Sequence, residues 1–363
     1  MKDNISFQRE SSADPLYSTM RDRVSNYLKV NGLESSAGRW QVFQSIIFLN
    51  LFVISYYLII AGVASGFGVI FAYGVLGFFA AICAINISHD SVHNSYVTSS
   101  WGNRILAYFI DLTGPSSYLW KTRHVVNHHT YTNIFGHDMD IDSPDVLRLC
   151  PSVKHHPILR FQHLYWPFLY ALKLLEWIYI ADTVDLIEKF KSVRRCRGSF
   201  SEIGMVVVFK VVHISLMVVL PMFFAEAQWW QIILGYVFYS MVAGFTVSII
   251  FQLAHVTEGT VFPLPGADGK ISMSFARHQL STTCNFGVNS RLLRIICGGL
   301  NFQVEHHLFP HLHHSVLYKI APIVKATALE FNAPYHEHSS FYQAVCSHVR
   351  TLKKLGRIPD ISL

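Results

Sequence analysis

The stretch FGVIFAYGVLGFFAAICAINISHDSVH, residues 67–93, establishes the fold class of this chain. It carries no charged residue before Asp90, and about 20 consecutive apolar residues are enough to span a membrane as a helix. It ends in His89 and His93, which are four residues apart and therefore project from one face of a helix. The stretch predicts a membrane helix that continues past its apolar part and carries two imidazoles out above the membrane surface.

Three other stretches have the length and composition of membrane helices. With the first, they give four expected spans: Val42–Val63, Phe67–Ile87, Met205–Ala225 and Trp230–Leu253. The links within each pair are short, so the spans form two hairpins. Hydrophobic residues make up 51% of the chain and charged residues only 14%, against about 25% in soluble domains. We therefore expect an all-α integral membrane protein with four transmembrane helices, in which residues 1–363 form a single domain.

The basic residues are distributed on one side of these spans. Of the 29 Lys and Arg residues, 28 lie before the first hairpin, between the hairpins or after the second, and only Lys210 lies in a span. Both hairpin tips lack them, so the positive-inside rule places both termini and the 88–203 loop in the cytoplasm. The net charge of +6 then describes a membrane face rather than a nucleic-acid site. The polar residues 1–40 show no cleavable signal peptide.

Two further segments are only partly apolar. Ile105–Trp120 contains Asp111, Gly114 and Pro115, which predicts a re-entrant or interfacial turn. Phe161–Ile180 is rich in aromatic residues and predicts a helix lying in the membrane interface, with a fifth or sixth span as the alternative. The connecting regions thus form interfacial helices and a histidine-rich cytoplasmic cap.

Histidines concentrate in three clusters on that cytoplasmic side. The candidate metal ligands are His89 and His93; His124, His128 and His129; and His306 and His307. In an α-helix, His124 and His128 would share one edge, whereas the adjacent pairs diverge. All histidines except His213 lie on this side, so three clusters that are far apart in sequence are able to meet. We expect them to form one shared metal site.

The ligand types narrow the choice of metal. Structural zinc favours cysteine, and catalytic zinc needs only three protein ligands. The chain has no Cys-x-x-Cys pair and no His-Glu-x-x-His motif of the zincins. Carboxylate di-iron bundles need glutamates within their helices, which these spans lack. An all-imidazole pair of iron ions fits this set of residues best.

Ligating imidazoles usually donate their second N–H to a carboxylate or carbonyl group. The acidic residues close to the clusters in sequence are Asp90, Asp138, Asp140, Asp142, Glu258 and Glu305. We expect the acceptors for the ligand rings to come from among them. His213 is expected to be a packing or interfacial residue.

The clusters and their surroundings resemble the membrane fatty acid desaturases. The matching motifs are Asn86–Asp90, Ser116–His124, His129–Asn133, Gly136–Asp138, Leu253–Glu258, Gly298–Gln303 and Leu308–His311. The third cluster opens with Gln303 rather than histidine, which is similar to the front-end desaturases and to the cyanobacterial Δ6 acyl-lipid (linoleoyl) enzymes. The resemblance runs from about Tyr27 to Lys354.

The resemblance implies further assignments. His255 matches a ninth ligand position of the family, and Gln303 stands where other members have a histidine ligand. The chain lacks the His-Pro-Gly-Gly motif of a fused cytochrome b5 domain, since Ile158 follows His156-Pro157. Electrons are therefore expected from a separate ferredoxin or cytochrome b5-type carrier, docked by the basic cytoplasmic face.

The implied activity is insertion of a cis double bond into an unsaturated acyl-lipid or acyl-CoA chain, with two iron ions as cofactor and O2 as co-substrate. Side-chain acid–base catalysis cannot remove hydrogen from an unactivated methylene group, so the oxidant is metal-bound. Trp120 and Tyr131 are candidate residues of an apolar substrate tunnel. Two alternatives remain open: a di-iron lipid hydroxylase or a desaturase of other regiochemistry, and, in a different class, a histidine-rich metal transporter. Transporters usually place ionisable residues within their spans, where this chain has only Lys210 and His213.

Overall fold

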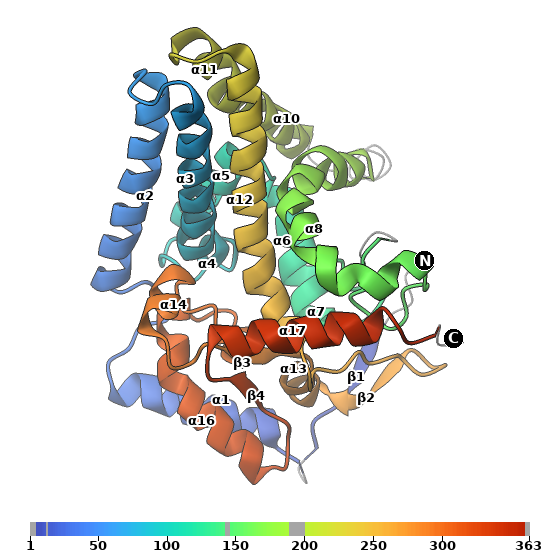
Figure 1. The fold of residues 1–363 in the computed structure, drawn as a ribbon. Coiled ribbons are helices and arrows are strands. Elements are labelled where there is room, and N and C mark those ends of the chain that lie inside the picture. Colours follow the sequence, from blue (N-terminus) through green and yellow to red (C-terminus); the bar gives the residue numbers. More distant parts are fainter. Residues whose placement is uncertain (1–4, 12–13, 142–145, 189–199, 360–363) are drawn as a thin grey trace. The chain divides into compact units, whose positions relative to one another are not determined.

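The computed structural model describes residues 5–11, 14–141, 146–188 and 200–359. It is mostly helical (Figure 1), and the chain forms two compact units. Unit 1 comprises Met1–Ser36, Arg123–Trp166 and Ile250–Leu363, and unit 2 comprises Ala37–Thr122 and Pro167–Ile249. The assignment of residues 1–363 to a single domain stays a prediction.

Four helices are long and apolar enough to cross a membrane. They are Arg39–Ile60, Phe67–Val92, Phe200–Phe224 and Trp229–His255, the only such helices among the described residues. The four expected spans are thus confirmed as long apolar helices, and their ends shift by up to five residues. The second helix runs through His89, as the sequence predicts.

The elements of unit 2 alternate regular helix with π-helical turns. In chain order they are α2 (Arg39–Ile60), α3 (Phe67–Cys83), the π-turn η1 (Ala84–Ser88), α4 (His89–Val92), α5 (Ser100–Thr113), α6 (Ser117–Lys121), the π-turn η4 (Trp177–Ala181), α10 (Phe200–Ile214), the π-turn η5 (Ser215–Val219) and α11 (Leu220–Phe224). Three more elements have residues in both units: α8 (Gln162–Glu176), α12 (Trp229–His255) and the π-turn η2 (Thr122–His128), of which only Thr122 belongs to unit 2. Between α3 and α12, a Cβ atom added at Gly77 would collide with the carbonyl group of Tyr239, so this close approach requires glycine.

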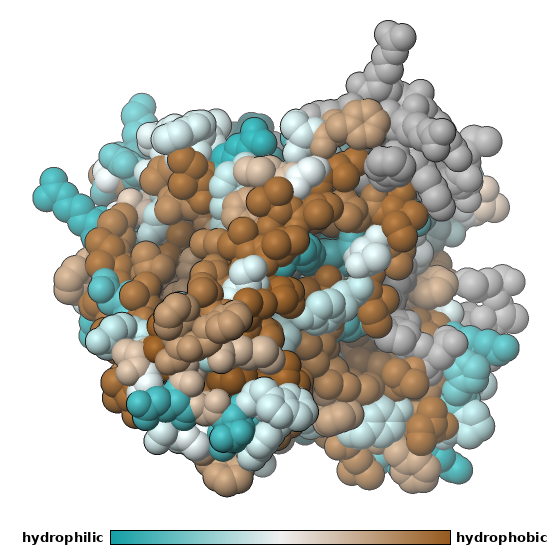
Figure 2. Space-filling model, turned by 90° about the horizontal axis from the view of Figure 1, so that it is seen from above, coloured by the Kyte–Doolittle hydropathy of each residue, from teal (hydrophilic) through white to brown (hydrophobic). Residues whose placement is uncertain are grey.

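The membrane-spanning helices differ in how they are covered. Only 17% of the most apolar part of α2 is buried, and Phe43, Val53 and Tyr57 are exposed, whereas 61% is buried along Phe67–Val92. Hydrophobic residues dominate the face of the molecule in Figure 2. In water the exposed apolar side chains along α2 would be unstable, and they fit a helix that faces lipid.

The segment expected to form an interfacial turn folds as two short helices, α5 and α6, on either side of Gly114. The last carbonyl groups of a helix have no partner within the helix. Here, side chains of the spanning helices donate hydrogen bonds to these carbonyl oxygens: His213 to Leu112 at 3.0 Å, Tyr239 to Thr113 at 3.2 Å and Lys210 to Gly114 at 2.6 Å. His213 is therefore the packing residue that we expected, and Lys210 also pairs with Asp182 at 2.6 Å.

Unit 1 combines short helices with two small parallel sheets. Its elements are β1 (Ser6–Gln8), α1 (Leu16–Val30), the π-turn η2 (Thr122–His128), α7 (His129–Tyr131), the 3-10 helix η3 (Pro157–Phe161), β2 (Lys270–Ser274), α13 (Phe275–Thr282), β3 (Cys284–Phe286), α14 (Arg291–Ile296), α15 (Gln303–Leu308), the 3-10 helix η6 (His314–Val316), α16 (Leu317–Glu330), β4 (His336–His338) and α17 (Phe341–Leu355). Strand β1 pairs with β2 and β3 with β4.

An apolar core supports the short helices of unit 1. Leu16, Met20 and Val24 lie on one face of α1, at helical spacing, and pack with α16 and with residues of α13 and α15. Arg148 is fully buried, and its guanidinium donates to the carbonyl groups of Leu355 and of residues just beyond α17. The core thereby fixes α13 and α15, which carry the candidate ligands of the third cluster and their neighbours.

Candidate metal centre

The second histidine cluster lies on a widened helical turn. Residues Thr122–His128 form the π-turn η2, in which hydrogen bonds join residues five apart rather than four. As a result His124 and His129, five apart, bring their Nε2 atoms to 3.2 Å. His124 and His128 also lie together as expected, with stacked rings 5.4 Å apart. Such turns are frequent at functional sites, and η1 occupies the corresponding place before His89.

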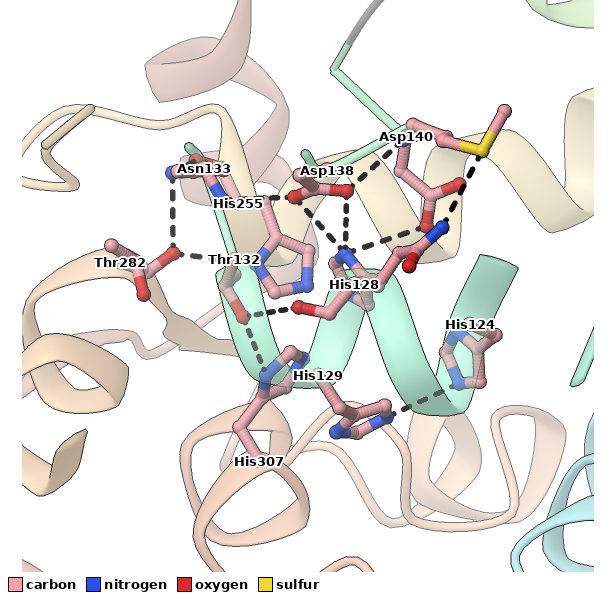
Figure 3. Close-up of polar contacts among 12 residues, drawn as sticks. His124, His128, His129, Thr132, Asn133, Asp138, Asp140, His255, Thr282 and His307 are labelled. Atoms are coloured by element: carbon pink, nitrogen blue, oxygen red, sulfur yellow. Dashed lines mark hydrogen bonds and ion pairs between the residues drawn. The ribbon is translucent and has the colours of Figure 1, made fainter. Parts of the chain in front are cut away.

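Three histidines from distant parts of the chain converge in unit 1. His128 at the end of η2, His255 at the end of α12 and His307 in α15 are buried, and each offers a ring nitrogen within 4.8 Å of the other two. Figure 3 shows these three rings facing one another. His255, which the sequence associated with the site only through family resemblance, is thus placed beside members of two clusters.

The second nitrogen of each ring is held by the protein. His128 Nδ1 lies 3.0 Å from a carboxylate oxygen of Asp138, and His255 Nδ1 lies 3.3 Å from the carbonyl oxygen of Thr282. His307 Nδ1 lies 3.0 Å from the side-chain oxygen of Gln279. All three partners are acceptors, so each Nδ1 carries a proton, and in the neutral ring the lone pair is then at Nε2.

These lone pairs fit a metal ion. The Nε2 atoms of His128 and His255 are buried and have no hydrogen-bond partner among the described residues. Leaving buried nitrogens unsatisfied costs about 1–3 kcal/mol each, unless a ligand binds them. Imidazoles whose outer N–H is tied to a carboxylate, carbonyl or amide oxygen are the usual arrangement around a bound metal. The residues present therefore fit the group that the sequence predicts.

A second group of rings adjoins the first. The rings of His129 and His306 lie 4.6 Å apart, centroid to centroid, and those of His129 and His124 lie 4.7 Å apart. Two nitrogens bound to one ion at about 2.0–2.1 Å are themselves roughly 3.0–3.4 Å apart. The 3.2 Å between the Nε2 atoms of His124 and His129 matches that spacing. His306 and His307 diverge as expected, with ring planes at 88°.

Asp138 is the electrostatic centre of the group. Its carboxylate is fully buried, contacts His128 Nδ1, and accepts hydrogen bonds from the backbone N–H groups of Asn133 and Asp140 at 2.8 and 3.0 Å. Burial disfavours its charge, but His128 and these donors outweigh burial and lower the pKa of Asp138. Burial likewise disfavours the imidazolium, yet the carboxylates of Asp138 and Asp140 raise the pKa of His128 to about 9. Without metal, the pair holds one proton that a metal ion would have to displace.

The structure adds positioning residues that the motifs did not indicate. Gln279 accepts from His307 and from the hydroxyl of Thr132, while its amide donates to the carbonyl oxygen of His129 at 3.1 Å. Asn133 has a left-handed backbone, with φ of 60°, and its side chain donates to the carbonyl oxygen of His255 at 3.0 Å. Gln279 lies in no motif, and its helix α13 (Phe275–Thr282) contains several other polar residues, so no signal in the sequence singles it out.

Glu305 is held away from the histidine rings. Its carboxyl group accepts from Asn285 and Tyr335, both at 2.8 Å, and burial raises its pKa to about 7. Asn285 also accepts from the backbone N–H of Val304. Glu305 therefore fixes the start of α15 in the structure, rather than bonding a ligand ring as we expected.

Glu258 also differs from the expectation that it would bond a ligand ring. Its side chain is 51% exposed and forms a bidentate ion pair with Arg350, at 2.6–2.9 Å, because α17 places that guanidinium beside it. Asp140 is partly exposed and lies 3.5 Å from His128, more distant than Asp138. Asp142 lies outside the described residues.

The first cluster belongs to unit 2. The rings of His89 and His93 lie 4.8 Å apart, and His89 Nδ1 lies 3.1 Å from the carboxylate of Asp90, the partner that we expected. Trp120 is buried with its ring 5.8 Å from that of His89. Binding of these histidines to the same ions as the unit 1 cluster stays a prediction.

The remaining candidates lie in unit 1. Gln303 is buried as the first residue of α15, and its amide nitrogen has no partner among the described residues. Tyr131 stacks on Phe7, with ring centroids 6.4 Å apart. Ligation by Gln303, and a tunnel lined by Trp120 and Tyr131, stay predictions.

Comparisons with known proteins agree with this geometry. The family model described as fatty acid desaturase matches residues 64–339. The chain is 34% identical to the sn-1 linoleoyl-lipid 6-desaturase of Arthrospira platensis over 288 residues, covering 79% of this chain and 77% of that protein. It is 31% identical to the acyl-lipid (8-3)-desaturase of Physcomitrium patens over 350 residues, covering 96% and 73%. With its four apolar helices and buried histidines, the chain belongs to the fatty acid desaturase family, a family of oxidoreductases.

Proposed function

We propose that this chain is a front-end desaturase that inserts a cis double bond into an unsaturated acyl lipid, acting at Δ6 on linoleoyl or linolenoyl chains. The observation that carries the proposal is the convergence of His128, His255 and His307, whose outer nitrogens are all bonded to the protein and whose inner nitrogens face one another. The relatives named as linoleoyl-lipid 6-desaturases support Δ6, whereas the (8-3)-desaturase favours a different position.

Two iron ions are the cofactor that this site is proposed to hold. His128, His255 and His307 form one group of ligands and His124, His129 and His306 the second, with His89, His93 and Gln303 completing the set. Reduced iron with O2 supplies an oxidant strong enough to attack an unactivated C–H bond, which no side chain of the protein does.

Residues of the protein fix the orientation of the proposed ligands before a metal ion binds. Asp138 and Gln279 fix the tautomers of His128 and His307, so each ring presents a lone pair without rotating. Burial of the ligands excludes water, which would otherwise compete for the metal and for the oxidant. Because the reaction has no acid–base step on the substrate, regiochemistry depends on where the acyl chain is held.

The proposal also includes the orientation of the chain in the membrane and the source of its electrons. We place the termini and the histidine clusters on the cytoplasmic side, on the distribution of 28 of the 29 basic residues. The donor is then a soluble ferredoxin or a cytochrome b5-type protein whose acidic surface matches that basic face.

The test is fatty-acid profiling of a host that expresses the chain and is fed linoleate. We expect a new product with a double bond between the existing one and the carboxyl end, lost in His128→Ala and kept in the matched control His163→Ala. A hydroxylated product would identify a hydroxylase instead, and undiminished product from His128→Ala would refute the proposed metal site.

A further inference from the structure

A row of aromatic rings in unit 2 begins beside the first histidine cluster. The ring of Trp120 lies 5.8 Å from that of His89, centroid to centroid, and 6.1 Å from that of Trp177. Trp177 packs in turn against the apolar core that contains Tyr236 and Tyr239, whose rings are stacked 6.1 Å apart. Rings at this spacing are in contact or nearly so, and an electron is therefore able to move from one ring to the next.

The far end of the row is a chain of hydrogen bonds with a defined direction. His213 Nδ1 lies 3.0 Å from the carbonyl oxygen of Leu112, an acceptor, so Nδ1 carries a proton. An imidazolium is costly inside a spanning helix, so His213 is neutral and its lone pair is at Nε2. The Tyr236 hydroxyl lies 2.9 Å from that Nε2 and donates to it. Because Tyr236 has then used its proton, the Tyr179 hydroxyl, 2.8 Å away, donates to Tyr236.

The two kinds of ring differ in how they are oxidised. An indole that loses an electron becomes a radical cation, which passes its charge on when no base removes the N–H proton. Trp177 Nε1 is buried and has no hydrogen-bond partner among the described residues. A phenol is oxidised readily only when its proton leaves with the electron, and His213 is the base that is placed to receive the proton of Tyr236. The tryptophans therefore suit a relay, and Tyr236 suits its end point.

Tyr179 connects this end point to the surface of unit 2. Its side chain is 45% exposed, whereas Tyr236 is 6% exposed. Tyr179 lies two residues beyond Trp177 in the π-turn η4. A reductant dissolved in the membrane is able to touch the Tyr179 ring and, through the 2.8 Å bond between the two hydroxyls, to supply an electron to Tyr236.

We propose that this row is an escape route for oxidising equivalents, which protects the metal site when an oxidant forms there without a bound acyl chain. The inference rests on the proposed function, because reduced iron and O2 supply the oxidant. Trp120 gives one electron to the oxidant, Trp177 refills Trp120, and Tyr236 refills Trp177 while its phenol proton moves to His213 Nε2. A membrane-soluble hydroquinone then returns one electron to Tyr236 and loses its own proton to water, and the first proton moves back from His213.

Freeze-quench electron paramagnetic resonance of the full-length, iron-loaded chain tests the inference without relying on activity. The protein is reduced and then mixed with O2 in the absence of acyl lipid. We expect a tyrosyl radical in the wild type and its loss in Tyr236→Phe. The signal should also be lost in His213→Gln, whose amide keeps an acceptor for Tyr236 and a donor for Leu112 but is not a base. Tyr57→Phe, at an exposed position of α2, is the matched control and should keep the signal.

Peptide mass spectrometry after the same reaction measures where oxidative damage falls. Oxygen addition at His89 and Trp120 should rise severalfold in Tyr236→Phe and in His213→Gln, with the helical content of both variants unchanged by circular dichroism. A tyrosyl signal that survives in Tyr236→Phe, or damage in both variants equal to that of the wild type, would overturn the inference.

The escape route and the proposed function fail separately in these experiments. If the wild type forms the tyrosyl radical but the expressing host makes no unsaturated product from linoleate, the proposed function fails while the route stands. If product forms, but the wild type shows no radical and the variants show no added damage, the route fails alone.

Discussion

Replacing Asp138 with Asn tests whether the carboxylate behind His128 sets the tautomer of this metal ligand. The carboxylate lies 3.0 and 3.1 Å from His128 Nδ1 and also accepts two backbone N–H groups. An asparagine has one oxygen for these three donors, so its NH2 group must face one of them. The least costly adjustment is for His128 Nδ1 to lose its proton and accept, which moves the proton to Nε2, the atom that should bind metal.

The expected loss follows from that exchange. One buried mismatched hydrogen bond costs about 1–3 kcal/mol, and substituting the partner of a ligand ring typically lowers metal affinity about 10–100-fold. Iron titration of the purified variant, with circular dichroism to confirm the fold, measures the change. Asp140→Asn is the matched control: its carboxylate is 38% exposed and 3.5 Å from the ring, so we expect a loss below about threefold. If Asp138→Asn binds iron as the wild type does, the reasoning about tautomers is wrong.

Three more predictions follow from buried contacts. Gln279→Leu removes the acceptor of His307 and should lower the iron affinity about tenfold. Gln279→Glu keeps an acceptor and should retain most of the wild-type affinity. An equal loss of affinity in the two variants would contradict a positioning role for Gln279. In the metal-free chain, the contribution of His128 to stability is fully present below its unfolded pKa of 6.5 and is lost as the pH rises through about 9. The contribution of Asp138 is fully present above its unfolded pKa of 3.8 and is lost as the pH falls through its lowered folded pKa. In denaturant unfolding of the metal-free chain, the contribution of this pair to the free energy of unfolding should therefore be greatest between these limits. Iron binding should release a proton, and the iron affinity should rise about tenfold per pH unit up to about pH 9. An iron affinity that does not depend on pH would contradict a shared proton between His128 and Asp138. Arg148→Met leaves buried carbonyl groups beyond α17 without donors and should lower the free energy of unfolding by about 3 kcal/mol, measured by thermal unfolding; a change below about 0.5 kcal/mol would show that Arg148 does not hold that end of the chain.

The long apolar runs predicted the spans because helix length is set by the thickness of the bilayer. The runs from Phe67 and Trp230 appear in the structure as helices within a few residues of their expected ends. Histidine clusters were equally visible, because several imidazoles grouped beside apolar segments are typical of a metal site. His255 became a candidate only through resemblance, because a single histidine carries no pattern of its own.

What the sequence did not reveal depends on tertiary contacts. The π-turn at His124 is a local widening of a helix, and nothing in its sequence distinguishes it from an α-helix. Gln279 reaches His307 across 28 residues, so no spacing rule identifies it. Glu258 was chosen for its nearness in sequence to His255, yet it pairs with Arg350, 92 residues away. Sequence proximity thus predicted Asp90 and Asp138 correctly as partners of histidines and failed where a distant cation competed.

The metal content of the protein is the decisive property for the proposed di-iron site. The chain would be purified without oxygen, alongside the combined His128→Ala, His255→Ala and His307→Ala variant and the His163→Ala control, and analysed by elemental mass spectrometry. We expect two iron ions per chain in the wild type and control, and loss of iron in the combined variant with its helical content retained. Zinc in place of iron, or undiminished iron in the combined variant, would show that these histidines do not form a di-iron site.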